Sequence, residues 1–90
     1  MKTLKIYKRT ILVRTGFKKY PYKSEIQYTV FYNGEEFKNH YEDINNKRLK
    51  IAFEKVLETR KTADVISFVD KLGRTDSDKF LKKIILNHIL

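Results

Sequence analysis

The sequence contains no cysteine, and its first 24 positions contain no acidic residue. The absence of cysteine excludes disulfides, thiolate metal sites and cysteine nucleophiles, and with them the usual support of small secreted scaffolds. No apolar run approaches the roughly 20 residues that span a bilayer, and the amino terminus lacks the apolar segment of a signal peptide. These absences predict a cytoplasmic protein without a membrane partner.

Glycine is scarce, and its three copies are isolated at positions 16, 34 and 73. The chain therefore has no glycine-rich loop that could cradle a phosphate group. Ser24, Ser67 and Ser77 lie in no nucleophile elbow or triad-like context. Neither His40 nor His88 has a cysteine or a second histidine within ligand spacing. The sequence accordingly predicts no catalytic residue, no cofactor and no resident metal.

The hydrophobic residues make up 41% of the 90 positions, which predicts one folded domain rather than a disordered chain. The formal net charge of +9 is divided unevenly along this domain. Residues 1–24 carry eight basic side chains, whereas residues 25–90 carry 12 basic and 11 acidic ones. The positive charge is therefore localised, and a localised cationic segment is typical of a surface that binds an anionic partner.

Alternating apolar residues predict a first strand over residues 3–15. The alternation changes phase between Ile6 and Ile11. Because a period of two cannot change phase without an extra residue or a break, we expect a bulge or a kink at residues 8–10.

Residues 16–23, GFKKYPYK, form the predicted loop after this strand. Gly16 can adopt φ > 0, and Pro21 pushes Tyr20 toward an extended conformation. Three lysines and three aromatic residues share the eight positions. Lysine neutralises phosphate charge and an aromatic face stacks on any base, so the loop is a candidate contact for nucleic acid. Alternatively, the aromatic residues cover a sheet edge that the lysines keep soluble.

In residues 25–32, Ile26, Tyr28, Val30 and Tyr32 alternate with the other positions, and the segment leads directly into Asn33-Gly34. An Asn-Gly pair between alternating segments is the strongest short signal for a hairpin, because both central residues of a type I′ turn need φ > 0. A two-residue turn fixes the register of the second strand. The expected opposite pairs are Tyr32 with Glu35, Val30 with Phe37, Tyr28 with Asn39 and Ile26 with Tyr41.

The polar face of this predicted hairpin gathers titratable groups. Its expected pairs are Glu25 with Glu42, Gln27 with His40 and Thr29 with Lys38. Paired carboxylates beside a lysine are typical of metal-dependent nucleases, and residues 36–38 have the acid-x-Lys spacing of these enzymes. The first strand supplies no further acidic residue. A metal-dependent nuclease is therefore a third option behind two binding functions.

Three helices are indicated after the hairpin. Asp43 is the expected N-cap of a helix over residues 44–60. Thr62 is the expected cap of a second helix that Gly73 ends in a left-handed conformation, and Thr75 begins a third with a capping box.

This order predicts an α+β fold, with a three-stranded antiparallel sheet (β-β-β) followed by two or three helices packed on one face. We expect a single domain over residues 1–90, with a basic β-sheet part over 1–42 and a helical part over 43–90. In element order alone, strands followed by a helix resemble the amino-terminal arm-binding domains of tyrosine integrases, which lay the sheet in the major groove. That resemblance implies DNA binding through the uncovered face of the sheet.

The first functional hypothesis is a small basic nucleic-acid-binding protein that contacts the phosphate backbone of DNA or RNA. The candidate contacts are Lys5, Lys8, Arg9, Arg14, Lys18, Lys19, Tyr20 and Lys23. The second hypothesis is a phage- or mobile-element-type inhibitor that occupies an acidic surface of a host protein. Lysine outnumbers arginine 15 to 5 and alanine occurs twice, a usage that suggests an AT-rich genome such as that of a low-GC bacterium or its phage.

Overall fold

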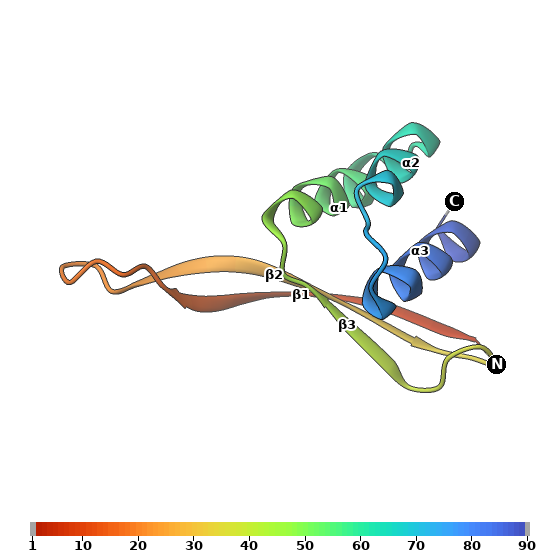
Figure 1. Cartoon of the computed structure of the whole chain (residues 1–90), viewed down its shortest axis with the longest axis horizontal. Helices are drawn as coiled ribbons and strands as arrows, with labels where there is room; N and C mark the ends of the chain where they lie inside the picture. Colours follow the sequence, from red (N-terminus) through yellow and green to blue (C-terminus); the bar gives the residue numbers. More distant parts are fainter. Residues whose placement is uncertain (1, 90) are drawn as a thin grey trace.

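The computed structural model describes residues 2–89, and its helices lie on one side of an antiparallel sheet (Figure 1). The strands are β1 (Thr3–Arg14), β2 (Tyr22–Asn33) and β3 (His40–Ile44), and they lie in the order β1-β2-β3. The helices are α1 (Lys47–Thr59), α2 (Thr62–Asp70) and α3 (Asp76–His88). The predicted α+β fold is therefore confirmed.

Strands β1 and β2 pair without interruption from Thr3–Asn33 to Arg14–Tyr22. No residue is inserted at positions 8–10, so the expected bulge is wrong. The apolar phase changes because the helices cover only the first half of β1. Ile6 is opposite Val30 on the helix side, whereas Ile11 is opposite Glu25 on the other side of the sheet.

Strand β3 pairs with β2 in a different register from the one predicted. The observed pairs are Tyr28 with Ile44, Thr29 with Asp43, Val30 with Glu42, Phe31 with Tyr41 and Tyr32 with His40. Residues 34–39 form the connection, and Gly34 does not adopt a positive φ, so the type I′ turn is wrong. The register differs by five residues, an odd number that exchanges the two faces of β3.

The burial of Ile44 explains this register. Its pairing with Tyr28 places Ile44 in the core at 1% exposure, where the predicted register would leave it outside the sheet. The longer connection is closed by a hydrogen bond from the Gly34 N–H to the Phe37 carbonyl at 2.8 Å. Phe37 then packs edge-on against Phe80 of α3, with ring centroids 5.0 Å apart. Burial of apolar surface therefore outweighs the local preference of Asn-Gly for a tight turn.

Helix α1 begins after Asn46, whose Oδ1 accepts hydrogen bonds from the N–H groups of Arg48 and Leu49 at 2.9 and 3.3 Å. Asp43 lies in β3, so its predicted role as the N-cap is wrong. Arg60 adopts a left-handed conformation with φ 54° directly after α1. This residue reverses the chain, and Figure 1 shows α2 folding back beside α1.

The ends of α2 also differ from the prediction. Thr62 is the first helical residue, and the preceding Lys61 makes no side-chain cap. The helix ends at Asp70 without a left-handed Gly73, so the expected glycine stop is wrong. Thr75 is confirmed as the N-cap of α3, because its side chain accepts a hydrogen bond from the N–H of Asp78 at 3.1 Å.

The core lies between the helices and one face of the sheet. Its fully buried large side chains are Val30, Tyr32, Ile44, Phe53, Val56, Val65, Phe68, Phe80, Ile84 and Ile85. Leu4 and Ile6 of β1 pack against this cluster. Because side chains alternate across a strand, the odd-numbered residues of β1 and β2 lie on the opposite face, which we call the open face.

The β1–β2 hairpin is longer than the part of the sheet that β3 and the helices complete. Strand β3 pairs only with residues 28–32 of β2, and the hairpin continues beyond them as a two-stranded ribbon. We call residues 10–26 the arm; it points away from the helices in Figure 1. The molecule measures 48 × 28 × 24 Å, and its radius of gyration of 14.5 Å exceeds the roughly 12 Å expected for a compact 90-residue domain.

Candidate functional site

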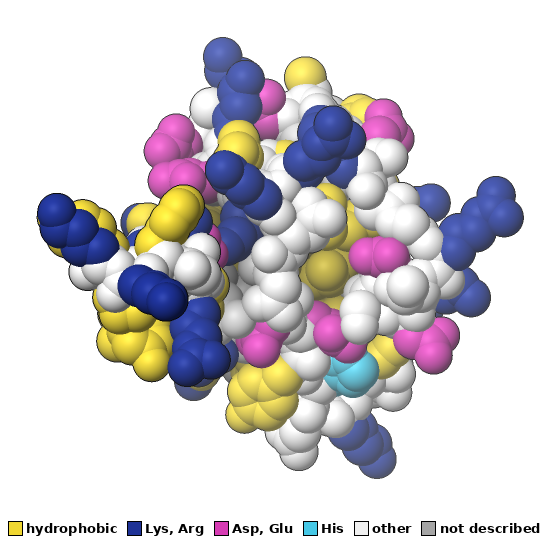
Figure 2. All heavy atoms as spheres, turned by 60° about the vertical axis from the view of Figure 1, so that its left-hand side comes forward, with side chains coloured by type: hydrophobic (Ala, Val, Ile, Leu, Met, Phe, Trp, Pro, Cys, Tyr) yellow, Lys and Arg dark blue, Asp and Glu magenta, His cyan; other side chains and the backbone are white. Residues whose placement is uncertain are grey.

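The arm carries the concentrated positive charge that the sequence indicates. Its charged residues are Arg14, Lys18, Lys19, Lys23 and the single acid Glu25. Figure 2 brings the arm toward the viewer at the left, where Lys and Arg side chains surround hydrophobic ones. Helix α1 contacts the base of this ribbon through Lys50 and Glu25, whereas the outer part of the arm extends away from the helices, so its cations are accessible from several sides.

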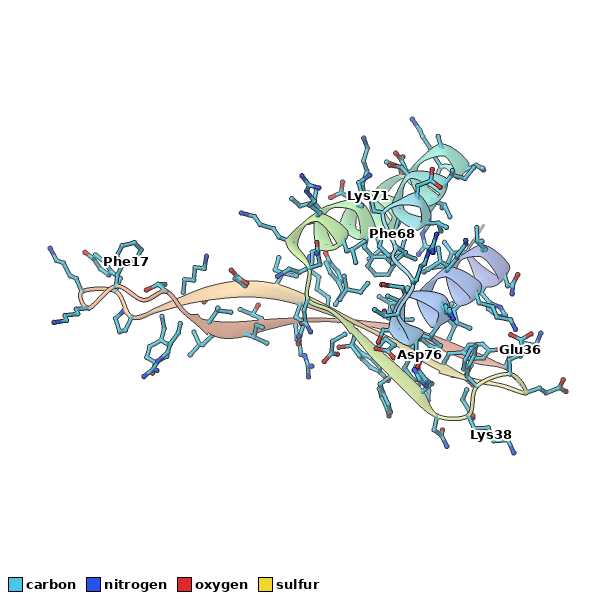
Figure 3. All side chains as sticks on the ribbon, in the orientation of Figure 1. Phe17, Glu36, Lys38, Phe68, Lys71 and Asp76 are labelled. Atoms are coloured by element: carbon cyan, nitrogen blue, oxygen red, sulfur yellow. The ribbon has the colours of Figure 1, made fainter. Side chains whose placement is uncertain are left out.

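The tip of the arm is held by short-range hydrogen bonds. The Thr15 N–H donates to the Pro21 carbonyl at 3.0 Å, and the Phe17 N–H donates to the Thr15 hydroxyl oxygen at 3.1 Å. Gly16 has φ +83°, so its predicted left-handed conformation is confirmed. Phe17 is 72% exposed and lies at the far end of the arm in Figure 3. The tip thus presents an exposed aromatic ring next to Lys18 and Lys19, on a backbone that hydrogen bonds hold in place.

A polar network fixes the root of the arm on the open face. The Arg9 Nε donates to the Gln27 Oε1 at 2.8 Å, and the Gln27 Nε2 donates to the Asn45 Oδ1 at 2.7 Å. The Thr29 hydroxyl donates to Asp43 at 2.6 Å, and Arg9 approaches the same carboxylate at 3.7 Å. These bonds join β1, β2 and the segment after β3. The direction of the arm is therefore set by the folded domain.

Glu25 provides a second link between the arm and the domain. Its carboxylate lies 3.1 Å from the Lys23 Nζ and 3.4 Å from the Lys50 Nζ of α1. Hydrogen bonds from Lys23 and then from Lys50 hold the pKa of Glu25 below its ordinary value. The one acidic group of the arm is thus satisfied within the protein, which leaves the other cations of the arm unopposed.

The structure distributes the eight predicted contact residues over two faces and a loop. Lys5, Arg9 and Lys23 lie on the open face, Lys8 and Arg14 lie on the opposite face, and Lys18, Lys19 and Tyr20 lie in the tip loop. Arg9 and Lys23 have acidic partners at 3.7 and 3.1 Å. Only in the arm, where both faces are uncovered, do cations from both sides of the ribbon come together.

Lys8 stands apart from the other predicted contacts. It lines a shallow hollow beneath α1 together with Glu54 and Glu58. Tyr28 shares this hollow, and burial, followed by the charges of Glu54 and Glu58, raises the pKa of its hydroxyl. Arg60 also lines this hollow, so Lys8 lies among charged groups of its own chain, two of which are acidic.

The carboxylate pair expected on the hairpin does not form. Glu25 lies on the open face opposite Ile11, whereas Glu42 lies on the helix side and binds the His40 Nε2 at 2.8 Å. The expected pairing was wrong because it depended on the two-residue turn. Within residues 2–89, no group of three or more His, Cys, Asp or Glu side chains could hold a metal ion.

The open face carries an aromatic patch that sequence reasoning missed, made of Tyr7, Phe31 and Tyr41. Phe31 is directly opposite Tyr41, with ring centroids 4.7 Å apart. Tyr7 is one row along, 46% exposed, and Tyr41 is 62% exposed. The predicted register set Tyr41 opposite Ile26 instead. The signal that could have revealed the patch is the aromatic residue in the polar phase of β2.

A hollow of about 570 Å³ lies between α1 and α2. Leu49 and Ala52 contribute its apolar lining. The charged groups at its rim are largely satisfied locally, since Lys71 donates to the Ser67 hydroxyl at 2.9 Å and Lys55 approaches Asp64 at 3.8 Å. This hollow offers no convergent set of unpaired polar groups and is a weaker candidate than the arm.

Together these features define a small single-domain α+β protein with a basic two-stranded arm and an uncovered sheet face. None of the helices in the part of the chain that the structure describes is long and apolar enough to cross a membrane. Comparison with protein-family models, with curated proteins and with solved structures finds no match for this chain.

Proposed function

We propose that the protein binds nucleic acid, and that the arm makes the main contacts with the phosphate backbone. The observation that carries this proposal is the position of Arg14, Lys18 and Lys19. These residues project on a ribbon that no described element covers, and within residues 2–89 they form no ion pair. Unpaired cations along a protruding element neutralise phosphates and release condensed counterions.

The shape of the arm supports the same partner. A two-stranded antiparallel ribbon is narrow enough to enter the major groove of a duplex, and it also follows a single-stranded backbone. The six pairs from Arg9–Gln27 to Arg14–Tyr22 extend it by roughly 20 Å at about 3.4 Å per pair, before the tip loop adds its own length. This reach places the tip lysines far from the acidic residues of α1.

The fixed root adds preorganisation to this surface. Gln27 is buried at 8% exposure and bonds both Arg9 and Asn45, so the base of the arm has little freedom to swing. A cationic element that is already in position loses less conformational freedom on binding than a flexible basic tail. Arg9 therefore contributes to binding through the direction of the arm as well as through its charge.

A protein partner with an acidic surface is the second candidate. The observation that favours it is the exposed apolar stripe of Ile26, Leu12 and Tyr22 on the helix-side face of the arm, in which Leu12 is 72% exposed. Apolar and aromatic anchors of this kind are typical of protein interfaces. An affinity pulldown with and without nuclease separates the two candidates. A stoichiometric protein partner that stays bound after nuclease treatment favours an inhibitor that binds a protein, and loss of all partners favours nucleic-acid binding.

The test of the proposed function is a salt titration of binding to duplex DNA, single-stranded DNA and RNA. If each of the four basic residues of the arm contacts one phosphate, log K should fall with log salt with a slope of about −3 to −4. We expect measurable binding at about 50 mM salt and a large loss by about 200 mM. A flat salt response, or no binding to any of the three at the lower salt, would overturn the proposal.

A further inference from the structure

The aromatic patch forms a row across the open face together with a cation. Lys5 lies opposite Phe31, and Phe31 lies opposite Tyr41, so a positive charge and two rings cross the three strands in line. Tyr7 occupies the next row beside Thr29. The rings of Phe31 and Tyr41 are tilted by 42° and have no helix above them.

The patch is continuous with the root of the arm. Along β1 the open face presents Lys5, Tyr7 and Arg9 in succession, at intervals of about 6.7 Å set by the strand. Cation, ring and cation thus alternate toward the arm. Asp43 is the acidic group beside Thr29 and Arg9 on this face, and it already accepts a hydrogen bond from Thr29 and is approached by Arg9.

We propose that this aromatic patch stacks the bases of single-stranded nucleic acid while Lys5, Arg9 and the arm hold its backbone. The inference rests on the proposed function and names the form of nucleic acid that the protein takes. Exposed rings on a sheet face offer flat surfaces on which two or three bases stack with little sequence preference. The flanking cations supply the electrostatic attraction that such stacking needs.

Single strands fit the patch better than a duplex does. The bases of a duplex are stacked on one another, and a flat sheet face cannot reach their rings without flipping them out. The unpaired bases of a single strand can turn toward Tyr7 and Tyr41, whose side chains are largely exposed. The patch therefore adds affinity for single strands that the arm alone would not distinguish from duplexes.

The experiment measures fluorescence anisotropy of labelled single-stranded DNA and RNA of about 12 nucleotides, a length within the usual range of sites, and of the matched duplex. The paired substitution Tyr7→Leu with Tyr41→Leu removes two rings and keeps apolar bulk. The matched control, Tyr7→Phe with Tyr41→Phe, keeps the rings. A 2-aminopurine base in the single strand reports stacking directly, and thermal unfolding of each variant checks the fold. Tyr41→Leu alone replaces the pair if the double variant does not fold.

We expect tighter binding of single strands than of duplex, and a loss of at least about tenfold for the leucine pair on single strands alone. The salt slope should stay unchanged, and the phenylalanine pair should bind like the wild type. Single-strand affinity of the leucine pair within twofold of the wild type, or a preference for duplex, overturns this inference and leaves binding by the arm standing. Absence of binding to every probe overturns both proposals.

Discussion

Phe31 on β2 lies directly opposite Tyr41 on β3, with ring centroids 4.7 Å apart and a tilt of 42°. This contact lies on the open face, away from the helices. It stabilises the pairing of the five-residue strand β3 in addition to the burial of Ile44 on the other face. Tyr41 is also accessible to a ligand, because it remains 62% exposed, and Phe31 is partly exposed beside it. Their structural and binding contributions can be measured separately.

The first prediction concerns the register of β3. A double-mutant cycle of Phe31→Leu and Tyr41→Leu, followed by urea unfolding, should give a coupling free energy of about 0.5–1.5 kcal/mol, as expected for an aromatic pair in contact. The matched cycle of Ile26→Ala and Tyr41→Leu should show no coupling, because Ile26 lies opposite Thr10. Coupling of Tyr41 to Ile26 instead of Phe31 would contradict the register.

The second prediction concerns the tip of the arm. Lys18→Glu with Lys19→Glu should weaken binding to all nucleic acids and reduce the salt slope by about 2, since two phosphate contacts are removed. Both lysines are exposed, so the free energy of unfolding should change by less than about 0.5 kcal/mol.

The control for the arm tip carries the same change in net charge elsewhere. Lys61→Glu with Lys82→Glu alters two exposed lysines of the helical part. It should lower affinity only through the overall charge and leave the salt slope close to that of the wild type. Equal losses from the two double variants would show that the arm has no special role.

The third prediction concerns Gly34, which is needed for space rather than for φ > 0. A Cβ at this position would overlap the Tyr32 hydroxyl and lie 2.7 Å from the Tyr32 Cζ. Tyr32 is completely buried, so any shift of its ring disturbs the packing of the core. Gly34→Ala should therefore lower the free energy of unfolding by about 1–3 kcal/mol.

Tyr32→Phe is the companion to that variant. The Tyr32 hydroxyl is buried and has no hydrogen-bond partner within the described residues. Its removal should leave the free energy of unfolding unchanged or raise it by about 1 kcal/mol, because an unsatisfied buried hydroxyl is costly. Gly34→Ala should also cost less in the Tyr32→Phe background. If Gly34→Ala left the free energy of unfolding in urea unchanged, the close approach of Gly34 and Tyr32 would be contradicted.

The fold class and several element ends could be predicted because local patterns determine them. Thr75 caps α3 and Gly16 takes φ +83°, since each needs only its own neighbours. The start of α1 could not be predicted, because Ile44 follows the good capping residue Asp43 but is buried in the core by pairing with Tyr28 in the sheet. Asn46 then caps the helix in place of Asp43.

The candidate site was predictable in charge but not in geometry. A count of charges places the basic segment in residues 1–24. Which of its cations remain free depends on register, because Arg9 meets Asp43 only where β3 is shifted by five residues. The aromatic patch has the same origin, since Phe31 and Tyr41 share a face only in the observed pairing. Long-range pairing of this kind is decided by burial, which a local sequence signal does not contain.

The fourth prediction concerns Glu25, which links the arm to α1. Its pKa is lowered, first by Lys23 and then by Lys50, so the folded state binds a proton on this group less readily than the unfolded state does. A depressed carboxylate pKa stabilises the fold above the unfolded pKa, and this contribution is lost as pH falls through the folded value. Wild type should therefore be more stable than Glu25→Gln at pH 7, and the difference should begin to shrink near the ordinary Glu pKa of about 4.3 and vanish below the lowered pKa of the folded state. Urea unfolding of both proteins between pH 7 and pH 3 measures this difference.

The matched control for Glu25 is Glu35→Gln. Glu35 is exposed in the connection before β3 and makes no ion pair within residues 2–89, so Glu35→Gln should leave the free energy of unfolding at pH 7 close to that of the wild type. The link between Glu25 and Lys50 also predicts a functional consequence. Glu25→Gln weakens this link and frees the base of the arm on the side of α1. The variant should bind nucleic acid with a higher on-rate because a negative charge is lost. It should also have a faster off-rate because the arm is less preorganised. Stopped-flow measurements at constant salt separate the two rates, and an unchanged off-rate would show that the polar network at Arg9 alone fixes the arm.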